Sequence, residues 1–353
     1  MEELRAAIEQ PGLKAVLFFC SSAYDLAALG QAIGRAFPCP IVGCTSAGQS
    51  GEQGYQRGGI TAVSLASDEL EVRPFLISPL TECRERAAAA AARAQATLAH
   101  MPPGRRAFGL LLADGLSLAE EGLTATLYQS LGDVPIVGGS AGDALAFKRT
   151  HVYWEGEFRS DAAVLAVFET SLRFALMKLQ HFRPTDKKLV ITKAEPALRL
   201  VLEIDGRPAA EAYAAAVGVP VEQLDATTLS AHPLMLRIGG DHYVRSIFRV
   251  NPDRSLSLLC AIDEGLVLAI GEGLDPLATL EGGFRESTRG FTRPALTIGC
   301  DCILRRMELE QRQLSEPVGA LLARHGVIGF STYGEQFNAI HVNQTFTGIV
   351  LGE

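Results

Sequence analysis

Two stretches of the chain pass through the same order of apolar and polar positions. Residues 13–39 contain a β-rich apolar run, a Ser-Ser turn and apolar residues at helical spacing, and they lead into "PIVGCTSAG" at residues 40–48. Residues 106–134 repeat this order and lead into "PIVGGSAGD" at residues 135–143. Short apolar runs between turn residues predict buried strands, and the helical spacing predicts a helix between them. The pattern therefore predicts a βαβ unit that occurs twice.

Both copies continue in the same way. Residues 58–76 and residues 158–179 each read as two strands joined by a polar turn. Between the copies, an Ala-rich helix is predicted to stop at Pro102. The theme returns more weakly near the C-terminus, where residues 295–313 read as strand, turn and helix and "VIGFSTYGE" at residues 327–335 echoes "IVGCTSAGQ". We therefore expect the second half of the chain to be a diverged relative of the first.

The order of these elements predicts an α/β fold of two domains. We expect mixed sheets with flanking helices, built from internally duplicated βαβ-type units, because 353 residues exceed what one core usually supports. The expected domains are residues 1–190 and residues 191–353. In the second domain, Asn-Pro-Asp-Arg at residues 251–254 predicts a hairpin. Residues 217–233 form an irregular connection, which in a compact domain is often functional.

Charge and composition exclude several classes of protein. The net charge is -8 and basic residues form no cluster longer than a pair, so we expect no nucleic-acid partner. No apolar run reaches the ~18 residues needed to cross a bilayer, and the start of the chain is charged and helical in pattern. We therefore expect a cytoplasmic protein without membrane insertion. The seven irregularly spaced cysteines favour reduced thiols, and Cys300 with Cys302 supplies too few ligands for a metal site.

Several ordered motifs resemble those of the bacterial FIST proteins. They are the two turns "IVGCTSAG" and "IVGGSAGD", the stretch "VITKAEPALRLVLEIDGRPAAEAY", and the closing "GFSTYGE" and "HVNQTFTG". The resemblance covers essentially the whole chain, with a FIST N-terminal domain over residues 1–190 and a FIST C-terminal domain over residues 191–353.

This resemblance implies an intracellular ligand-sensing role in signal transduction rather than catalysis. FIST domains are regarded as sensor modules. Some proteins similar to this one are haem proteins that sense nitric oxide and regulate a histidine kinase, and an earlier proposal for the family was amino-acid sensing. No segment of this chain resembles an output domain, so we expect the signal to pass to a separate protein, most specifically a histidine kinase. The oligomeric state stays open.

The nitric oxide version of this role requires a haem ligand, which in a sensor is usually a histidine in an apolar pocket. We expect His232 to be the axial ligand, because it ends the irregular connection and precedes an apolar run that includes Met235 and could face a porphyrin. A structural histidine in a turn is the alternative. The cofactor would be haem b, since no Cys-x-x-Cys-His attachment motif is present. Arg237 and Arg245 flank a Gly-Gly turn and could hold a propionate or a ligand carboxylate.

Polar residues near the C-terminus offer a different binding site. His341, the second candidate haem ligand, alternates with polar residues on one face of a predicted strand. If the last two segments pair, hydroxyls, amides and one carboxylate converge: Ser331, Thr332, Glu335, Asn343, Gln344 and Thr345. Such a set suits a small polar metabolite such as an amino acid, bound without haem.

The repeated small-residue turns leave two interpretations open and raise an enzymatic alternative. Backbone N–H groups after a strand can hold an anion, but a duplicated fold also keeps a tight turn because glycine adopts positive φ at little cost. An enzyme would use Cys44 or Ser140 as its nucleophile. The first turn, "GCTSAG", lacks the Gly-x-Ser-x-Gly pattern of a nucleophile elbow, and no histidine lies at a motif-defined position, so we expect no catalysis.

Overall fold

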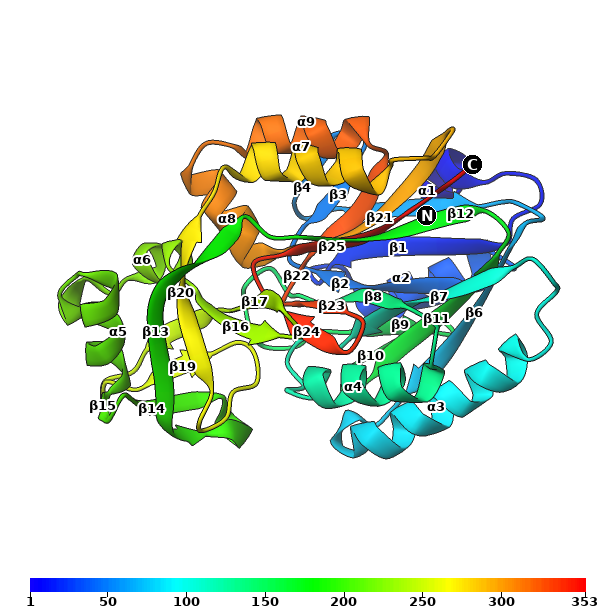
Figure 1. The fold of residues 1–353 in the computed structure, drawn as a ribbon. Coiled ribbons are helices and arrows are strands. Elements are labelled where there is room, and N and C mark those ends of the chain that lie inside the picture. The colour runs from blue at the N-terminus through cyan, green and yellow to red at the C-terminus, as the bar shows by residue number, and fades with distance from the viewer.

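The computed structural model describes residues 1–353 and shows a mixed α/β protein of two domains (Figure 1). The larger domain, here called the body, contains three mixed sheets with helices on their outer faces. The smaller domain, here called the lobe, runs from β13 (Phe182–Glu195) to β20 (Val267–Gly273) and projects from one end of the body. The predicted fold class is confirmed. No helix is both long enough and apolar enough to span a bilayer.

The body consists of three copies of one unit. In each copy the first strand lies between a parallel second strand and an antiparallel last strand. The first copy comprises β1 (Ala15–Ser21), α2 (Leu26–Ala36), β2 (Ile41–Ser46), β3 (Gln49–Gly51), β4 (Gly54–Gln56) and β5 (Ile60–Leu65). The second comprises β7 (Arg106–Ala113), α4 (Glu120–Leu131), β8 (Ile136–Ser140), β9 (Val152–Trp154), β10 (Glu157–Arg159) and β11 (Ala163–Thr170). The third comprises β21 (Pro294–Cys302), α8 (Ile303–Gln311), α9 (Ser315–Arg324), β22 (Val327–Thr332), β23 (Glu335–Phe337), β24 (Ile340–Val342) and β25 (Phe346–Gly352).

Each hairpin pairs with a neighbouring copy. The hairpin β9–β10 joins β2, the hairpin β23–β24 joins β8, and the hairpin β3–β4 joins β22. The connecting strands β6 (Leu70–Ile77) and β12 (Arg173–Leu179) lie beside β11 and β25 of the following copies. Every sheet is therefore completed by chain from another copy, and the faint C-terminal echo in the sequence is a full third unit.

The three sheets share a central core. β1 is apolar from Ala15 to Cys20 and buried throughout, as expected of a strand covered on both faces. The core cluster contains Phe19 of β1 and Phe330 of β22, whose rings stack with centroids 4.4 Å apart. Helices cover the outer faces: α2 lies on β1, α3 (Cys83–Leu98) and α4 on β7, and α7 (Pro276–Ser287) and α9 on β25 (Figure 1). The N-terminal α1 (Glu2–Ile8) contacts β5.

The lobe has a sheet and a core of its own. Its remaining elements are η2 (Pro196–Leu198), β14 (Leu200–Ile204), β15 (Arg207–Pro208), α5 (Ala209–Val217), η3 (Val221–Gln223), α6 (Ala226–Ala231), β16 (Leu234–Ile238), β17 (Asp241–Arg245), β18 (Ile247–Val250) and β19 (Leu256–Leu258). The hairpin predicted at residues 251–254 joins β18 to β19. The expected boundary between residues 190 and 191 falls inside β13, and residues 276–353 pack in the body. The lobe is thus an insertion between β12 and α7.

Candidate functional site

The turns that follow β2, β8 and β22 meet in the body and close a ring. In each turn a backbone N–H donates to a backbone C=O of another copy: Ala47 to Ser331 (3.0 Å), Tyr333 to Ser140 (3.0 Å) and Gly142 to Thr45 (3.1 Å). These N–H groups are used between the copies and are not free to hold an anion. The geometry favours the structural interpretation of the repeated turn.

The turn after β8 differs from the other two because residues 143–150 intervene before the next strand. The buried carboxylate of Asp143 accepts hydrogen bonds from the backbone N–H groups of Phe147 (2.9 Å), Lys148 (2.7 Å) and Arg149 (3.0 Å), and from the hydroxyl of Tyr333. Burial disfavours the ionised form, but these hydrogen bonds lower the pKa of Asp143. One side chain therefore fixes the path of the whole loop.

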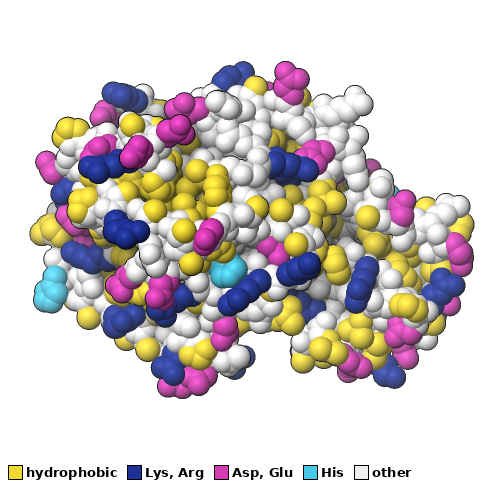
Figure 2. Space-filling view, turned by 180° about the vertical axis from the view of Figure 1, so that it is seen from behind, with side chains coloured by type: hydrophobic (Ala, Val, Ile, Leu, Met, Phe, Trp, Pro, Cys, Tyr) yellow, Lys and Arg dark blue, Asp and Glu magenta, His cyan; other side chains and the backbone are white.

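A cleft of about 310 Å³ lies between this loop and the lobe. The body contributes Leu116, Leu118 and Phe147 to its wall, and the lobe contributes Leu198, Phe248 and Leu258. In the space-filling view from behind, the lobe stands at the right and a notch separates it from the body along the lower edge (Figure 2). The cleft is thus built by both domains.

The rim of the cleft is apolar and exposed. Leu198 is 64% exposed, Leu118 is 55% exposed, and Phe147 and Phe248 are each 40% exposed. The ring of Phe147 stacks on that of Tyr333 (4.8 Å) and meets Phe248 edge-on (5.5 Å), so it joins the two domains. Large exposed apolar side chains around a hollow are typical of a ligand-binding site.

Several residues around the cleft hold a backbone conformation that side chains disfavour. Positive φ angles occur at Leu118 (57°), Ala144 (56°), Leu145 (68°), Phe147 (49°) and Arg199 (51°). Each such residue costs roughly 1 kcal/mol or more and persists only where its surroundings enforce it. Strain of this kind gathers at binding sites, which supports the assignment of the cleft.

Arg199 bridges the two domains at the cleft wall. Its Nη2 donates to carboxylate oxygens of Glu120 and Glu121 on α4 (2.7 Å each), and its Nη1 donates to the C=O of Leu259 (2.7 Å). Burial lowers the pKa of the guanidinium, but the two carboxylates outweigh this effect and raise the pKa, so Arg199 stays charged. Removing either side of this contact would leave a buried charge without a partner.

Further contacts between the lobe and the third copy are also polar. The lobe donates three side-chain hydrogen bonds: Arg245 Nη1 to the C=O of His341 (2.6 Å), Ser246 Oγ to Oε1 of Gln344 (2.8 Å) and Cys260 Sγ to Oδ1 of Asn343 (2.8 Å). Polar interfaces are typical of domains that move relative to one another. The junction between the domains therefore depends on polar contacts rather than on a large apolar interface.

The predicted C-terminal polar set comes together inside the protein. Each member has an exposed fraction of 0%: Ser331, Thr332, Glu335, Asn343, Gln344 and Thr345. Glu335 accepts hydrogen bonds from the hydroxyl of Thr332 and from the backbone N–H of Thr345 (3.3 Å). Burial raises the pKa of Glu335 well above its usual range. The set forms a buried network, and none of its members lines the cleft.

The surroundings of His232 do not fit a haem. His232 is half-buried at the end of α6, and its C=O accepts a hydrogen bond from the hydroxyl of Tyr213 (2.6 Å). Met235 is 1% exposed and packs into a core cluster of the lobe, so it does not face an open space. Neither residue lines one of the main cavities, and Arg237 is exposed on β16. A porphyrin in contact with Met235 would require the lobe core to unpack.

The other residues expected to carry chemistry are enclosed. His341 is 1% exposed, so a porphyrin does not fit against it either. Cys44 lies in the central core, where burial raises the pKa of its thiol well above the usual range. Ser140 is buried and accepts a hydrogen bond from Nε2 of Gln336 (2.8 Å). None of the three lines a main cavity.

The cleft residues themselves were missed by sequence reasoning. Phe147 lies in the mixed stretch "GDALAFKRT", and a phenylalanine shortly after a small-residue turn and next to Lys148 and Arg149 was a usable signal. Glu120, Glu121 and Arg199 carry no local pattern that announces their pairing, because they lie on different domains.

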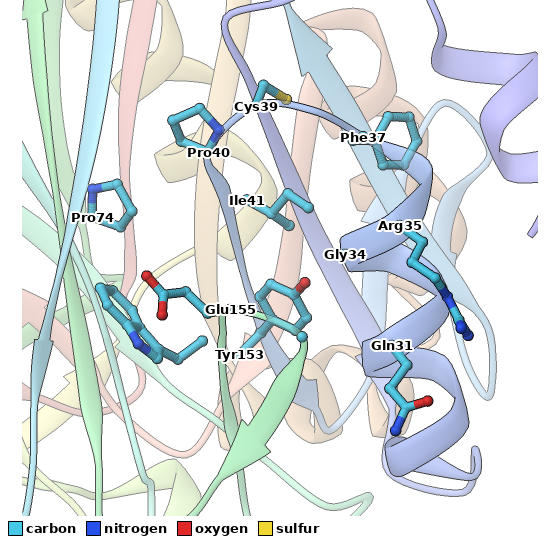
Figure 3. A pocket seen from close by; sticks show the side chains of 12 residues that line it. Gln31, Gly34, Arg35, Phe37, Cys39, Pro40, Ile41, Pro74, Tyr153 and Glu155 are labelled. Carbon is cyan, nitrogen blue, oxygen red and sulfur yellow. The ribbon is translucent and has the colours of Figure 1, made fainter.

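A larger hollow of about 790 Å³ opens beside α2. Figure 3 shows Gly34 and Gln31 of the helix on one side and Pro74 and Glu155 on the other, with Tyr153 between them. This groove belongs to the body alone. It contains neither the cluster of strained residues nor a buried ion pair, so we place the candidate site in the smaller cleft.

Comparison with known proteins identifies the family of this chain. Residues 14–207 match the FIST N domain and residues 209–338 match the FIST C domain. An 80-residue stretch is 36% identical to the uncharacterized protein MJ1623 of Methanocaldococcus jannaschii, covering 23% of this chain and 15% of that protein. The chain thus spans a small part of that relative. The two domain matches together cover most of the 353 residues of this chain. The chain therefore belongs to the FIST family.

Proposed function

We propose that this protein is a ligand sensor whose small-molecule ligand binds in the cleft between the body and the lobe. The observation that carries the proposal is that strained backbone and exposed apolar side chains from both domains surround one hollow. A ligand held there contacts both domains, so it stabilises one relative orientation over others. FIST N and FIST C domains are consistent with such a role in signal transduction.

The lining favours a ligand with a flat apolar body and one acidic group. Phe147, Phe248 and Tyr333 offer aromatic surface, and the cavity volume of about 310 Å³ suits a small molecule. Arg249 lies in the wall, and only its Nε is held, by Oδ1 of Asn251 (3.0 Å). Its terminal nitrogens are left to bind a carboxylate.

Two finer expectations remain predictions. The first is a separate histidine kinase as the partner, which the family resemblance implies; movement of the lobe would transmit the signal to it. The second is haem-based sensing of nitric oxide. Because the residues around His232 and His341 do not fit a porphyrin, we place a haem-free ligand first.

A thermal-shift screen tests the proposal. The panel contains aromatic carboxylic acids, amino acids and haem, each added in excess to the full chain. We expect aromatic acids to raise Tm, because a ligand that binds only the folded state stabilises it. Phe147→Ala and Arg249→Ala should remove the shift. Tyr128→Ala is the matched control, since Tyr128 is 41% exposed and lies outside the cleft.

Two results would contradict the proposal. One is a shift that persists undiminished in Phe147→Ala and Arg249→Ala. The other is a shift produced by haem alone, with a Soret band that moves on exposure to nitric oxide and is lost in His232→Ala.

A further inference from the structure

Three side chains of different chemistry converge behind the cleft. One donor atom each from Glu121, Cys260 and His341 lies within 4.8 Å of the other two. Cys260 and His341 are buried and Glu121 is half-buried. Glu121 is on α4 and His341 on β24 of the body, whereas Cys260 follows β19 in the lobe. We propose that these residues form a site for a divalent cation of the zinc type, held between the two domains.

The donor set matches the preference of such a cation. Zinc binds thiolate, imidazole and carboxylate, and a site with three protein ligands keeps its fourth position for water. In a tetrahedral site the donors lie roughly 3.3–3.6 Å apart. Donors already within 4.8 Å need only small side-chain rotations to reach that spacing. A set of oxygen donors alone would favour magnesium or calcium, which this set does not.

An unsatisfied atom supports the assignment independently of the donor spacing. Nε2 of His341 has no hydrogen-bond partner although the residue is 1% exposed. A buried polar atom without a partner is costly and calls for an explanation. Cation binding at this nitrogen would supply the missing partner.

The neighbouring groups can orient the ligands. The backbone N–H of Ala261 (2.5 Å) and Nη2 of Arg199 (2.7 Å) donate to the two oxygens of Glu121. Nδ1 of His341 lies 3.4 Å from the amide of Gln336. Hydrogen bonds of this kind around a metal fix the direction of its ligands.

The charge around the site is compatible with a bound cation. Glu120 and Glu121 balance Arg199 and Arg245, all of which lie at this junction. On binding, the thiol of Cys260 releases its proton to solvent and becomes the thiolate ligand. The added charge of a divalent cation is thus partly neutralised by the ligand it creates. Because the ligands come from both domains, the cation would fasten the lobe to the body.

Cobalt(II) provides the test, because cobalt thiolate bonds absorb light. The full chain, reduced and freed of metal by a chelator, is titrated with cobalt(II) and then with zinc. We expect one equivalent of cobalt to produce a thiolate charge-transfer band that zinc abolishes. Cys260→Ser should remove the band. Cys83→Ser should keep it, because Cys83 is a partly exposed thiol on α3 outside the cluster.

Each outcome decides the proposal. Absence of the band in the wild-type chain overturns it, as does a band that persists in Cys260→Ser. If Cys260→Ser fails to fold, the cobalt titration of His341→Gln decides instead: the band should be lost or should require a large excess of cobalt, and an unchanged band overturns the proposal. The proposed function does not depend on this site, since the thermal-shift screen changes residues of the cleft and none of the three proposed cation ligands.

Discussion

The turn after β2 and the turn after β8 begin with nearly the same sequence and continue differently. After β2 the chain enters β3 at Gln49, and the hydroxyl of Ser46 donates to the C=O of Cys20 (3.1 Å) while accepting from Gln49 (2.7 Å). After β8 the chain makes the loop of residues 143–150, with positive φ angles, before β9 begins. The third turn enters β23 at Glu335 and follows the first pattern.

The candidate site lies where the repeat is broken. The regular turns use their polar groups to close the ring between copies, and nothing is left over for a ligand. The irregular loop instead carries Phe147 to the surface and anchors it through Asp143. The regular turns thus hold the copies together, and the longer loop forms one wall of the candidate site.

The largest effect is expected at the glycine shared by all three copies. A Cβ at Gly138 would lie 2.0 Å from the C=O oxygen of Leu111, and one at Gly329 would lie 2.0 Å from that of Gly299. Alanine at either position forces the paired strands apart, and we expect a loss of about 4 kcal/mol or more in the free energy of unfolding. Gly43→Ala should behave similarly. Urea denaturation measures the free energy of unfolding of each variant. A loss of stability in only one of the three variants would contradict the equivalence of the three copies.

Smaller losses of stability are expected in the turns after β2 and β8, and they should differ between the two. Asp143→Ala removes the acceptor of three backbone N–H groups, and we expect it to cost about 3 kcal/mol and to weaken ligand binding in the cleft. Ser46→Ala is the matched change in the regular turn, and we expect it to cost about 1 kcal/mol without affecting binding. Thermal denaturation and ligand titration of both variants check this. Equal losses of binding would show that the loop has no special role.

A change in the pH dependence of stability is expected for Glu335→Gln. Burial raises the pKa of this carboxyl, so the folded protein keeps the proton that the unfolded chain releases near its ordinary pKa of about 4.3. Wild-type stability therefore loses the contribution of this group as pH rises above that value. Between about pH 5 and pH 8 the variant should gain stability relative to wild type, as measured by urea denaturation. A difference that does not change with pH would mean that Glu335 is ionised in the folded state.

Much of the body could be predicted from the sequence. The apolar runs that lead to Ser46 and Ser140 have the same spacing of apolar residues and end in similar small-residue turns. This pattern predicts a strand, a helix and a second strand in each copy. The exchange of hairpins between copies could not be predicted, because short strands such as β9 carry no signal of which strand they pair with. The third copy was predicted only as a weaker echo, because its turn keeps only part of the shared sequence.

The candidate site was harder to predict than the fold. His232 and Met235 occupy a suggestive stretch of sequence, but tertiary packing buries Met235 in the lobe core. The polar residues from Ser331 to Thr345 do converge, although as a buried network. Cys260 and Glu121 are separated by much of the chain, and only the insertion of the lobe brings them together.

A fluorescence titration with anilinonaphthalene sulfonate tests the central claim most directly, because this probe has a flat apolar body and one acidic group. At a temperature well below unfolding, we expect saturable binding to the wild-type chain at one site. The double variant Phe147→Ala with Phe248→Ala should bind about tenfold more weakly or worse, while Tyr24→Ala with Tyr128→Ala, two exposed tyrosines outside the cleft, should bind as wild type. Equal binding by all three proteins would contradict a ligand site between the body and the lobe.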